Sequence, residues 1–120
     1  AATAVVDKNA IRILDQEIRD AEVAQGKARD SLATLVARRR ILEQEITSLR
    51  DQVAKYENSA RAAVNKGDMD LARQVAQRIA DLEGEIGLKT PQIEQMRASE
   101  TQIQQAVVQT DRKIETLRRE

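Results

Sequence analysis

The sequence contains no cysteine and no histidine among its 120 residues. Without them the chain cannot form disulfide bonds and lacks the usual ligands of zinc and the usual nucleophile–base pairs of covalent catalysis. It also has no Phe and no Trp, and Tyr56 is its one aromatic residue. Because aromatic side chains supply much of the buried area in a globular core, their near absence argues against a compact globular fold. We predict that the chain is not an enzyme and has no catalytic residue, metal site or cofactor.

The sequence also lacks an excess of charge of either sign and has no long apolar run. Lys plus Arg and Asp plus Glu number twenty each, so no net field attracts nucleic acid, and we expect no nucleic-acid partner. No apolar run approaches the ~20 residues that cross a bilayer, and residues 1–10 lack the basic and apolar regions of a signal peptide. Since there is no initiator Met and the helical pattern continues to Glu120, we expect an excised part of a longer protein.

What the sequence does have is a seven-residue apolar repeat in each half. Steps of three and four residues alternate, which keeps one stripe on one side of a helix and favours a left-handed supercoil. We call these positions the seam. In the first half they are Ile11, Leu14, Ile18, Ala21, Gln25, Ala28, Leu32, Leu35, Arg39, Leu42, Ile46, Leu49, Val53, Tyr56, Ala60 and Ala63. In the second half they are Ala72, Val75, Ile79, Leu82, Ile86, Lys89, Ile93, Met96, Glu100, Ile103, Val107, Thr110, Ile114 and Leu117.

Between the two halves lies Asn65-Lys66-Gly67-Asp68. Gly67 can adopt the left-handed conformation that ends a helix, and Asp68 suits the N-cap of the next one. The predicted fold is therefore all-α, a long antiparallel two-helix coiled-coil hairpin with its turn at about 65–68. We expect a frayed lead-in over 1–9 and a hairpin over 10–120, with helices at 10–65 and 69–118 and a turn at 66–68.

Pro91, preceded by Gly84 and Gly87, interrupts the second half. Proline removes a backbone donor and clashes with the preceding turn. Either Thr90 caps a fresh helix with Pro91 at its first position, or one helix continues with a kink near 87–91. Because the seam keeps its stepping across Pro91, we predict the kinked but continuous helix.

Folding at Gly67 sets a register in which the numbers of facing seam residues sum to 135. This places Gln25 opposite Thr110, so that two polar interruptions share one layer. Matched interruptions are expected of a real register, because a buried polar group without a partner is costly. Lys89 faces Ile46 and has no matched partner in this register, so its stem is expected to reach outward.

Function is expected on surfaces, because no pocket chemistry is apparent. Off-seam apolar residues are candidates for docking another helix. They are Ile13, Val23, Val36, Ile41, Val64, Leu71, Leu88 and Val108. From the members of this set that lie away from the turn, we select Ile13, Val36, Ile41, Leu88 and Val108 as docking candidates. In the basic run of residues 38–40, Arg39 falls on the seam, which leaves Arg38 and Arg40 as anion-binding candidates; a solvated helix face is the favoured alternative.

Two segments carry a family resemblance. The stretch Ile-Leu-Asp-Gln-Glu-Ile-Arg-Asp-Ala-Glu at 13–22 resembles the start of the coiled coil in the phage shock protein A family, which includes the vesicle-inducing plastid relatives. The stretch from Tyr56 to Arg73, with Asn-Lys-Gly-Asp followed by Asp-Leu-Ala-Arg, resembles that family's hairpin tip. The similarity covers about residues 11–120. It makes the tip a binding candidate, formed by Val64, Lys66, Gly67, Asp68, Asp70 and Leu71.

The resemblance implies a bacterial envelope-stress protein on the cytoplasmic face of the inner membrane that forms homo-oligomeric, ESCRT-III-like polymers. Lipid contact in such proteins comes from an N-terminal amphipathic helix, which residues 1–10 do not supply. The leading hypothesis is the coiled-coil core of a membrane-maintenance scaffold. The alternatives are a regulatory module that binds and inhibits an AAA+ transcriptional activator of the phage shock response, or a generic coiled-coil spacer.

Overall fold

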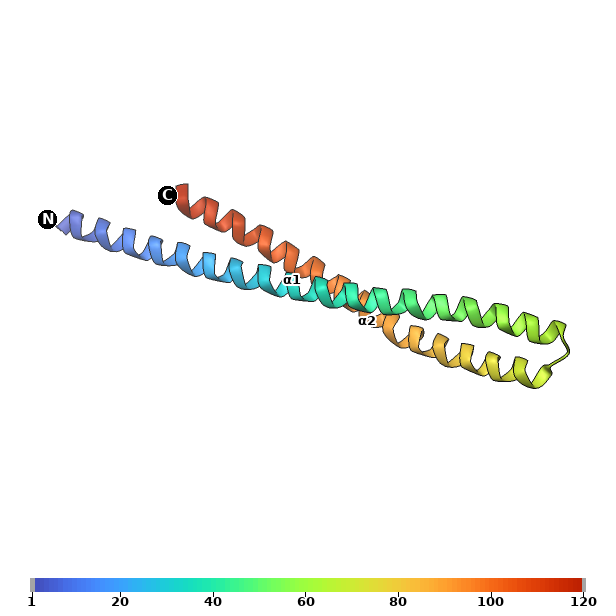
Figure 1. Cartoon of the computed structure of the whole chain (residues 1–120). Helices are drawn as coiled ribbons and strands as arrows, with labels where there is room; N and C mark the ends of the chain where they lie inside the picture. Colours follow the sequence, from blue (N-terminus) through green and yellow to red (C-terminus); the bar gives the residue numbers. More distant parts are fainter. Residues whose placement is uncertain (1, 120) are drawn as a thin grey trace. The chain divides into compact units, whose positions relative to one another are not determined.

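The chain forms two long helices in a computed structural model, which describes residues 2–119 and the side chains of 7–119. Helix α1 spans Ala2–Asn65 and helix α2 spans Met69–Arg119 (Figure 1). Both are rich in Ala, Leu, Glu, Gln and Arg, which have high helix propensity. The two helices pack against each other, so the predicted all-α helical hairpin is confirmed.

The helix bounds differ from the predicted ones mainly at the start. Helix α1 begins at Ala2, whereas residues 1–9 were expected to fray. No Gly or Pro occurs in this stretch to stop the helix, and three of its residues are alanines. Residue 1 of the predicted lead-in lies outside the described residues. The turn occupies residues 66–68, and α2 ends at Arg119 instead of Arg118.

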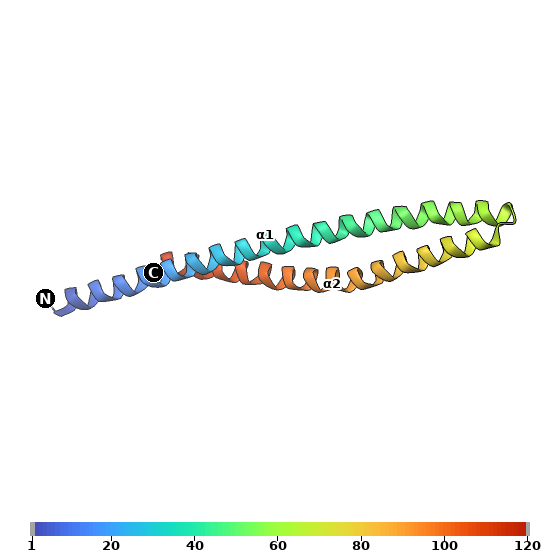
Figure 2. The same ribbon diagram turned by 60° about the horizontal axis from the view of Figure 1, so that its bottom comes forward.

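The hairpin divides into two compact units. The first combines residues 1–36 with 98–120, and the second is the continuous stretch 37–97, which contains the turn. Each unit is built from one stretch of α1 and one stretch of α2 lying side by side (Figures 1 and 2). The interactions below are therefore described unit by unit.

Burial follows the seam. Every seam position from Leu14 to Ala63 and from Ala72 to Leu117 is buried or half-buried. The most deeply buried apolar side chains of the first unit are Ala21, Ile114 and Leu117, and those of the second are Ile46, Leu49, Ala63, Ala72 and Leu82. Ile11 is the exception, with 57% of its surface exposed.

Helix α2 runs without interruption through Pro91. Of the two alternatives for this segment, the continuous helix agrees with α2 and a fresh helix capped by Thr90 does not, while the kink near 87–91 stays a prediction. The Thr90 hydroxyl instead donates to the backbone oxygen of Ile86 at 2.8 Å, within the same helix. Lys89 also differs from expectation, because its Nζ lies 3.5 Å from Oε2 of Glu45 and is thus paired. The register places Lys89 opposite Ile46. Its long, flexible side chain instead reaches Glu45, the residue before Ile46.

Candidate functional site

The hairpin tip owes its shape to Gly67. This glycine has a φ of +77°, in the left-handed region that side chains with a Cβ rarely adopt. Its N–H donates to the backbone oxygen of Val64 at 3.0 Å, and the N–H of Asp68 donates to that of Ala63 at 2.9 Å. This pair of bonds is the Schellman motif, which satisfies carbonyl groups left over at the end of a helix. The sequence predicted this role for Gly67.

Asp68 begins the second helix at once. Its carboxylate Oδ1 accepts a hydrogen bond from the N–H of Leu71 at 3.1 Å, and its backbone oxygen accepts from Ala72 at 3.1 Å. Both bonds are those of an N-cap residue. Asp70 adds a carboxylate to the first turn of α2, where the helix dipole favours negative charge. Asp70 also pairs with Arg73 at 3.2 Å. The turn is thus fixed by local bonds on both sides.

The tip surface is exposed and partly apolar. All six residues that the sequence analysis placed there are exposed. Val64 and Leu71 keep 51% and 46% of their surfaces accessible. Met69, with 49% exposed, belongs to the same surface, although sequence reasoning missed it. Its position off the seam and next to the cap Asp68 was the available signal.

Most off-seam apolar candidates away from the tip are also exposed. The exposed fractions are 61% for Ile13, 55% for Ile41, 73% for Leu88 and 47% for Val108. Val36 differs from the other candidates, because it is half-buried. It directly follows the seam residue Leu35 and therefore lies at the edge of the helix interface. Val36 is therefore a weaker docking candidate than the sequence suggested.

The basic run at 38–40 separates into a seam residue and two surface residues. The Arg39 side chain is only 14% exposed, and its Nη1 donates to Oε2 of Glu43 at 3.0 Å. Arg38 and Arg40 are exposed. The three arginines therefore do not act as one cluster, which agrees with the heptad phase of Arg39.

Glu43 is held between two guanidinium groups in the second unit. Its Oε1 accepts a hydrogen bond from Nη2 of Arg97 at 2.6 Å, and its Oε2 accepts the bond from Arg39. Desolvation, the largest single influence, raises the pKa of this carboxyl group. The hydrogen bonds and charges of Arg97 and Arg39 together outweigh it, so the pKa of Glu43 lies below its ordinary value of 4.5. Arg97 thus links α2 to α1 through a carboxylate that stays ionised.

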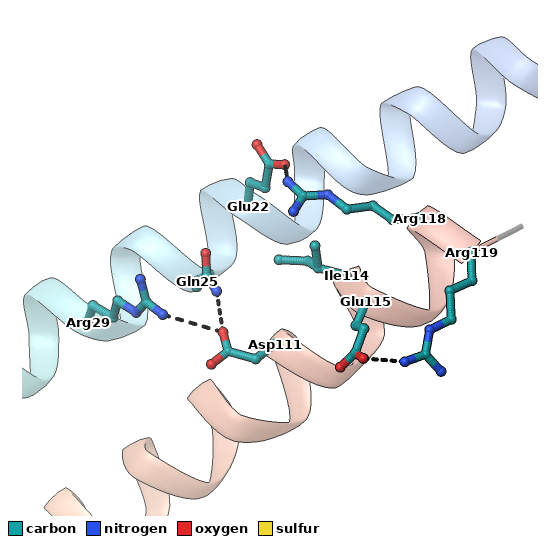
Figure 3. A pocket seen from close by; sticks show the side chains of 8 residues that line it. All are labelled: Glu22, Gln25, Arg29, Asp111, Ile114, Glu115, Arg118 and Arg119. Carbon is teal, nitrogen blue, oxygen red and sulfur yellow. Dashed lines mark hydrogen bonds and ion pairs between the residues drawn. The ribbon is translucent and has the colours of Figure 1, made fainter.

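A polar cluster connects the helices of the first unit (Figure 3). The side-chain amide of Gln25 donates to Oδ1 of Asp111, and Nη2 of Arg29 lies 3.5 Å from the same oxygen. Gln25 was expected to share its layer with Thr110, the residue directly before Asp111. The Thr110 hydroxyl donates instead to the backbone oxygen of Ala106 at 2.8 Å. The register is thus met to within one residue, while the polar partner differs.

The hollow around this cluster is about 490 Å³ and is open to the surface. Arg118 Nη2 donates to Oε1 of Glu22 at 2.7 Å, and Arg119 pairs with Glu115 on its own helix (Figure 3). Every basic side chain that lines the hollow therefore lies beside a carboxylate. This charge balance suits the pairing of two helices better than the binding of an anionic ligand.

Within residues 2–119, neither helix has a stretch apolar enough to span a bilayer. In that same part of the chain, no acidic side chains gather in a group that would suit a metal ion.

Comparison with known proteins gives a consistent result. The family model described as the PspA/IM30 family matches residues 1–120. An uncharacterised protein of Escherichia coli K12, YjfJ, is 30% identical over 115 residues, which cover 95% of this chain and 50% of that protein. A phage shock protein A homolog of Deinococcus radiodurans is 36% identical over 67 residues, which cover 56% of this chain and 30% of that protein.

The chain thus spans about half the length of the Escherichia coli relative. Its all-α helical hairpin agrees with the fold that the resemblance implies. Because the family model matches the whole length, the chain belongs to the PspA/IM30 family, a family of phage-shock-type envelope-stress proteins.

Proposed function

We propose that this chain is the coiled-coil core of a scaffold that maintains the bacterial inner membrane under envelope stress and that assembles by side-to-side contact of hairpins. The observation that carries the proposal is the exposure of large apolar residues off the seam, led by Leu88 at 73% and Ile13 at 61%. These side chains lie off the seam that packs α1 against α2, and most of their surface is accessible. Family membership supports the stress-related part of the proposal.

The energetics favour coverage of these residues by another copy. Complete burial of a Leu or Ile side chain contributes about 1.5–3 kcal/mol. Ile13 and Ile41 also share one heptad phase, since they are separated by four repeats. Several such contacts, repeated along a polymer, offset the entropy that each copy loses on assembly.

Lipid contact in this proposal comes from a part of the full-length protein outside residues 1–120. The hairpin supplies the contacts between copies on the cytoplasmic face of the inner membrane. A membrane-binding amphipathic helix needs a broad, continuous apolar face. The exposed apolar residues described for this hairpin do not form such a face, which fits a role in contacts between copies instead of contacts with lipid.

The test uses the full-length protein with four substitutions together, I13Q, I41Q, L88Q and V108Q. The matched control is Lys27→Gln, a substitution at another exposed position off the seam. We expect the fourfold variant to keep its helical content, because the seam is untouched, and to lose at least tenfold in the fraction that sediments as polymer with or without anionic vesicles. The control is expected to sediment like the wild type.

A fourfold variant that assembles like the wild type would contradict the proposal. If that variant also loses capture of an AAA+ transcriptional activator in a pull-down, the regulatory alternative replaces the scaffold. If it assembles normally and the wild type captures no activator, the spacer reading remains.

A further inference from the structure

The segment of α2 around Pro91 differs from the rest of the second unit. Pro91 has no N–H to donate to the backbone oxygen of Gly87, which lies four residues before it. The two neighbouring carbonyl groups each accept a side-chain hydrogen bond. Thr90 Oγ1 donates to the oxygen of Ile86 at 2.8 Å, and Gln92 Nε2 donates to that of Leu88 at 3.2 Å. Polar side chains thus support the backbone on both sides of the missing bond.

Gly84 and Gly87 have no steric reason to be glycines in this hairpin. A Cβ built on either one meets no atom within 4 Å. Neither has the positive φ that favours glycine, unlike Gly67. What they do contribute is backbone freedom, because glycine lowers the stability of a helix interior relative to alanine. Together with Pro91, they make 84–91 the stretch of α2 with the lowest helix propensity.

The facing stretch of α1 is the opposite in character. The register places residues 44–51 alongside 84–91, and the Lys89–Glu45 ion pair of 3.5 Å connects the two. This stretch of α1 contains no Gly and no Pro. Its seam residues Ile46 and Leu49 are buried. The helix is therefore expected to be more stable in residues 44–51 of α1 than in the facing residues 84–91 of α2.

We propose that residues 84–91 of α2 form a built-in hinge that opens locally while residues 44–51 of α1 stay helical. Opening separates Lys89 from Glu45 and uncovers the half-buried seam side chain of Ile86. Local openings of this kind occur without global unfolding where buried apolar contacts are few and backbone hydrogen bonds are exposed to solvent. The hinge is a property of the single hairpin and does not depend on the proposed assembly.

Amide hydrogen exchange of the full-length protein tests the hinge. We expect amides of residues 84–92 to exchange at least tenfold faster than those of residues 44–51. Replacement of Pro91 by Ala restores the missing donor and a better helix former. Exchange in 84–92 should then slow by about a hundredfold, the equivalent of ~3 kcal/mol at 1.4 kcal/mol per factor of ten. Gly26→Ala, at another helical glycine with no atom near its Cβ, is the control and should leave exchange in 84–92 unchanged.

Equal exchange in the two stretches, or no change in Pro91→Ala, would overturn the hinge. The double variant G84A/G87A tests the competing explanation that the glycines admit the close approach of another molecule. If that variant loses polymer in the sedimentation assay while its exchange in 84–92 stays at the wild-type rate, close approach is the correct explanation and the hinge is wrong. Slower exchange with normal sedimentation supports the hinge.

Discussion

Gln25 donates a side-chain hydrogen bond to Asp111 across 86 residues of sequence. The bond joins the two helices of the first unit at a level where the seam is polar instead of apolar. A polar pair of this kind fixes register, because a shift by one heptad would leave both groups partly buried without a partner. Gln25 and Asp111 are thus more informative about the pairing of the helices than the apolar layers, which are interchangeable.

The substitution Asp111→Ala should lower the free energy of unfolding by about 1 kcal/mol, since it leaves the part-buried Gln25 amide without its acceptor. Urea denaturation followed by circular dichroism measures the change. The matched control is Asp20→Ala. It removes the acceptor of an exposed hydrogen bond from Gln16, and both residues of that bond lie on α1. Its effect should stay within about 0.5 kcal/mol. Equal losses in the two variants would contradict a register role for Asp111.

Leu82 is the most deeply buried leucine, with 1% of its surface exposed, whereas Leu88 on the same helix is 73% exposed. Truncation of Leu82 to Ala should cost about 2–5 kcal/mol, because the change removes buried methyl groups and leaves a cavity between the helices. The same substitution at Leu88 should change stability by less than about 0.5 kcal/mol. Thermal unfolding of the two variants checks the contrast. A similar loss in both would place Leu88 in the helix interface.

Gly67 and Gly26 should respond to alanine in opposite directions. Gly67→Ala forces a side chain into the left-handed region at φ +77° and should destabilise the hairpin by about 1–2 kcal/mol. Gly26 lies inside α1 with no atom near its Cβ, so Gly26→Ala should stabilise by about 0.5–1 kcal/mol. Chemical denaturation resolves both changes. A neutral Gly67→Ala would mean that the turn has another accessible conformation.

Glu43 makes stability depend on pH. Its folded-state pKa lies below the ordinary value of 4.5, so the ionised form stabilises the fold above that pH, and the contribution is lost as the pH falls through the folded-state pKa. The melting temperature of the wild type should therefore fall more steeply below about pH 4.5 than that of Glu43→Gln. Glu115→Gln, which removes an exposed pair on one helix, is the control and should follow the wild type. Parallel curves for the wild type and Glu43→Gln would contradict this role.

The sequence predicted the helix-packing face because it depends on spacing alone. Alternation of three and four residues identified positions such as Leu49 and Leu82 before any contact was known, and even the polar seam residue Arg39 is largely covered. The turn was equally readable, since a left-handed backbone and an N-cap each demand particular residues, here Gly67 and Asp68. Both rules act over a few residues, so neither needs tertiary information.

The partners of long polar side chains were not predictable in the same way. A Cβ position is fixed by the register, but several rotatable bonds separate it from the charged atom. Lys89 therefore reaches Glu45 beside its expected neighbour, and Gln25 bonds to Asp111 while the Thr110 hydroxyl is satisfied within its own helix. The start of α1 was missed for a different reason. A helix without a strong N-terminal stop signal continues as far as its residues allow, and α1 therefore begins at Ala2.

The short turn at 66–68 also sets the order in which the hairpin closes. Ala63 and Ala72, the first facing pair, are only nine residues apart in sequence, and each further layer encloses a longer loop. Since the entropy lost on closing a loop grows with its length, contacts beside Gly67 form at the lowest cost. Folding is thus expected to start at the turn and to proceed layer by layer toward the two chain ends.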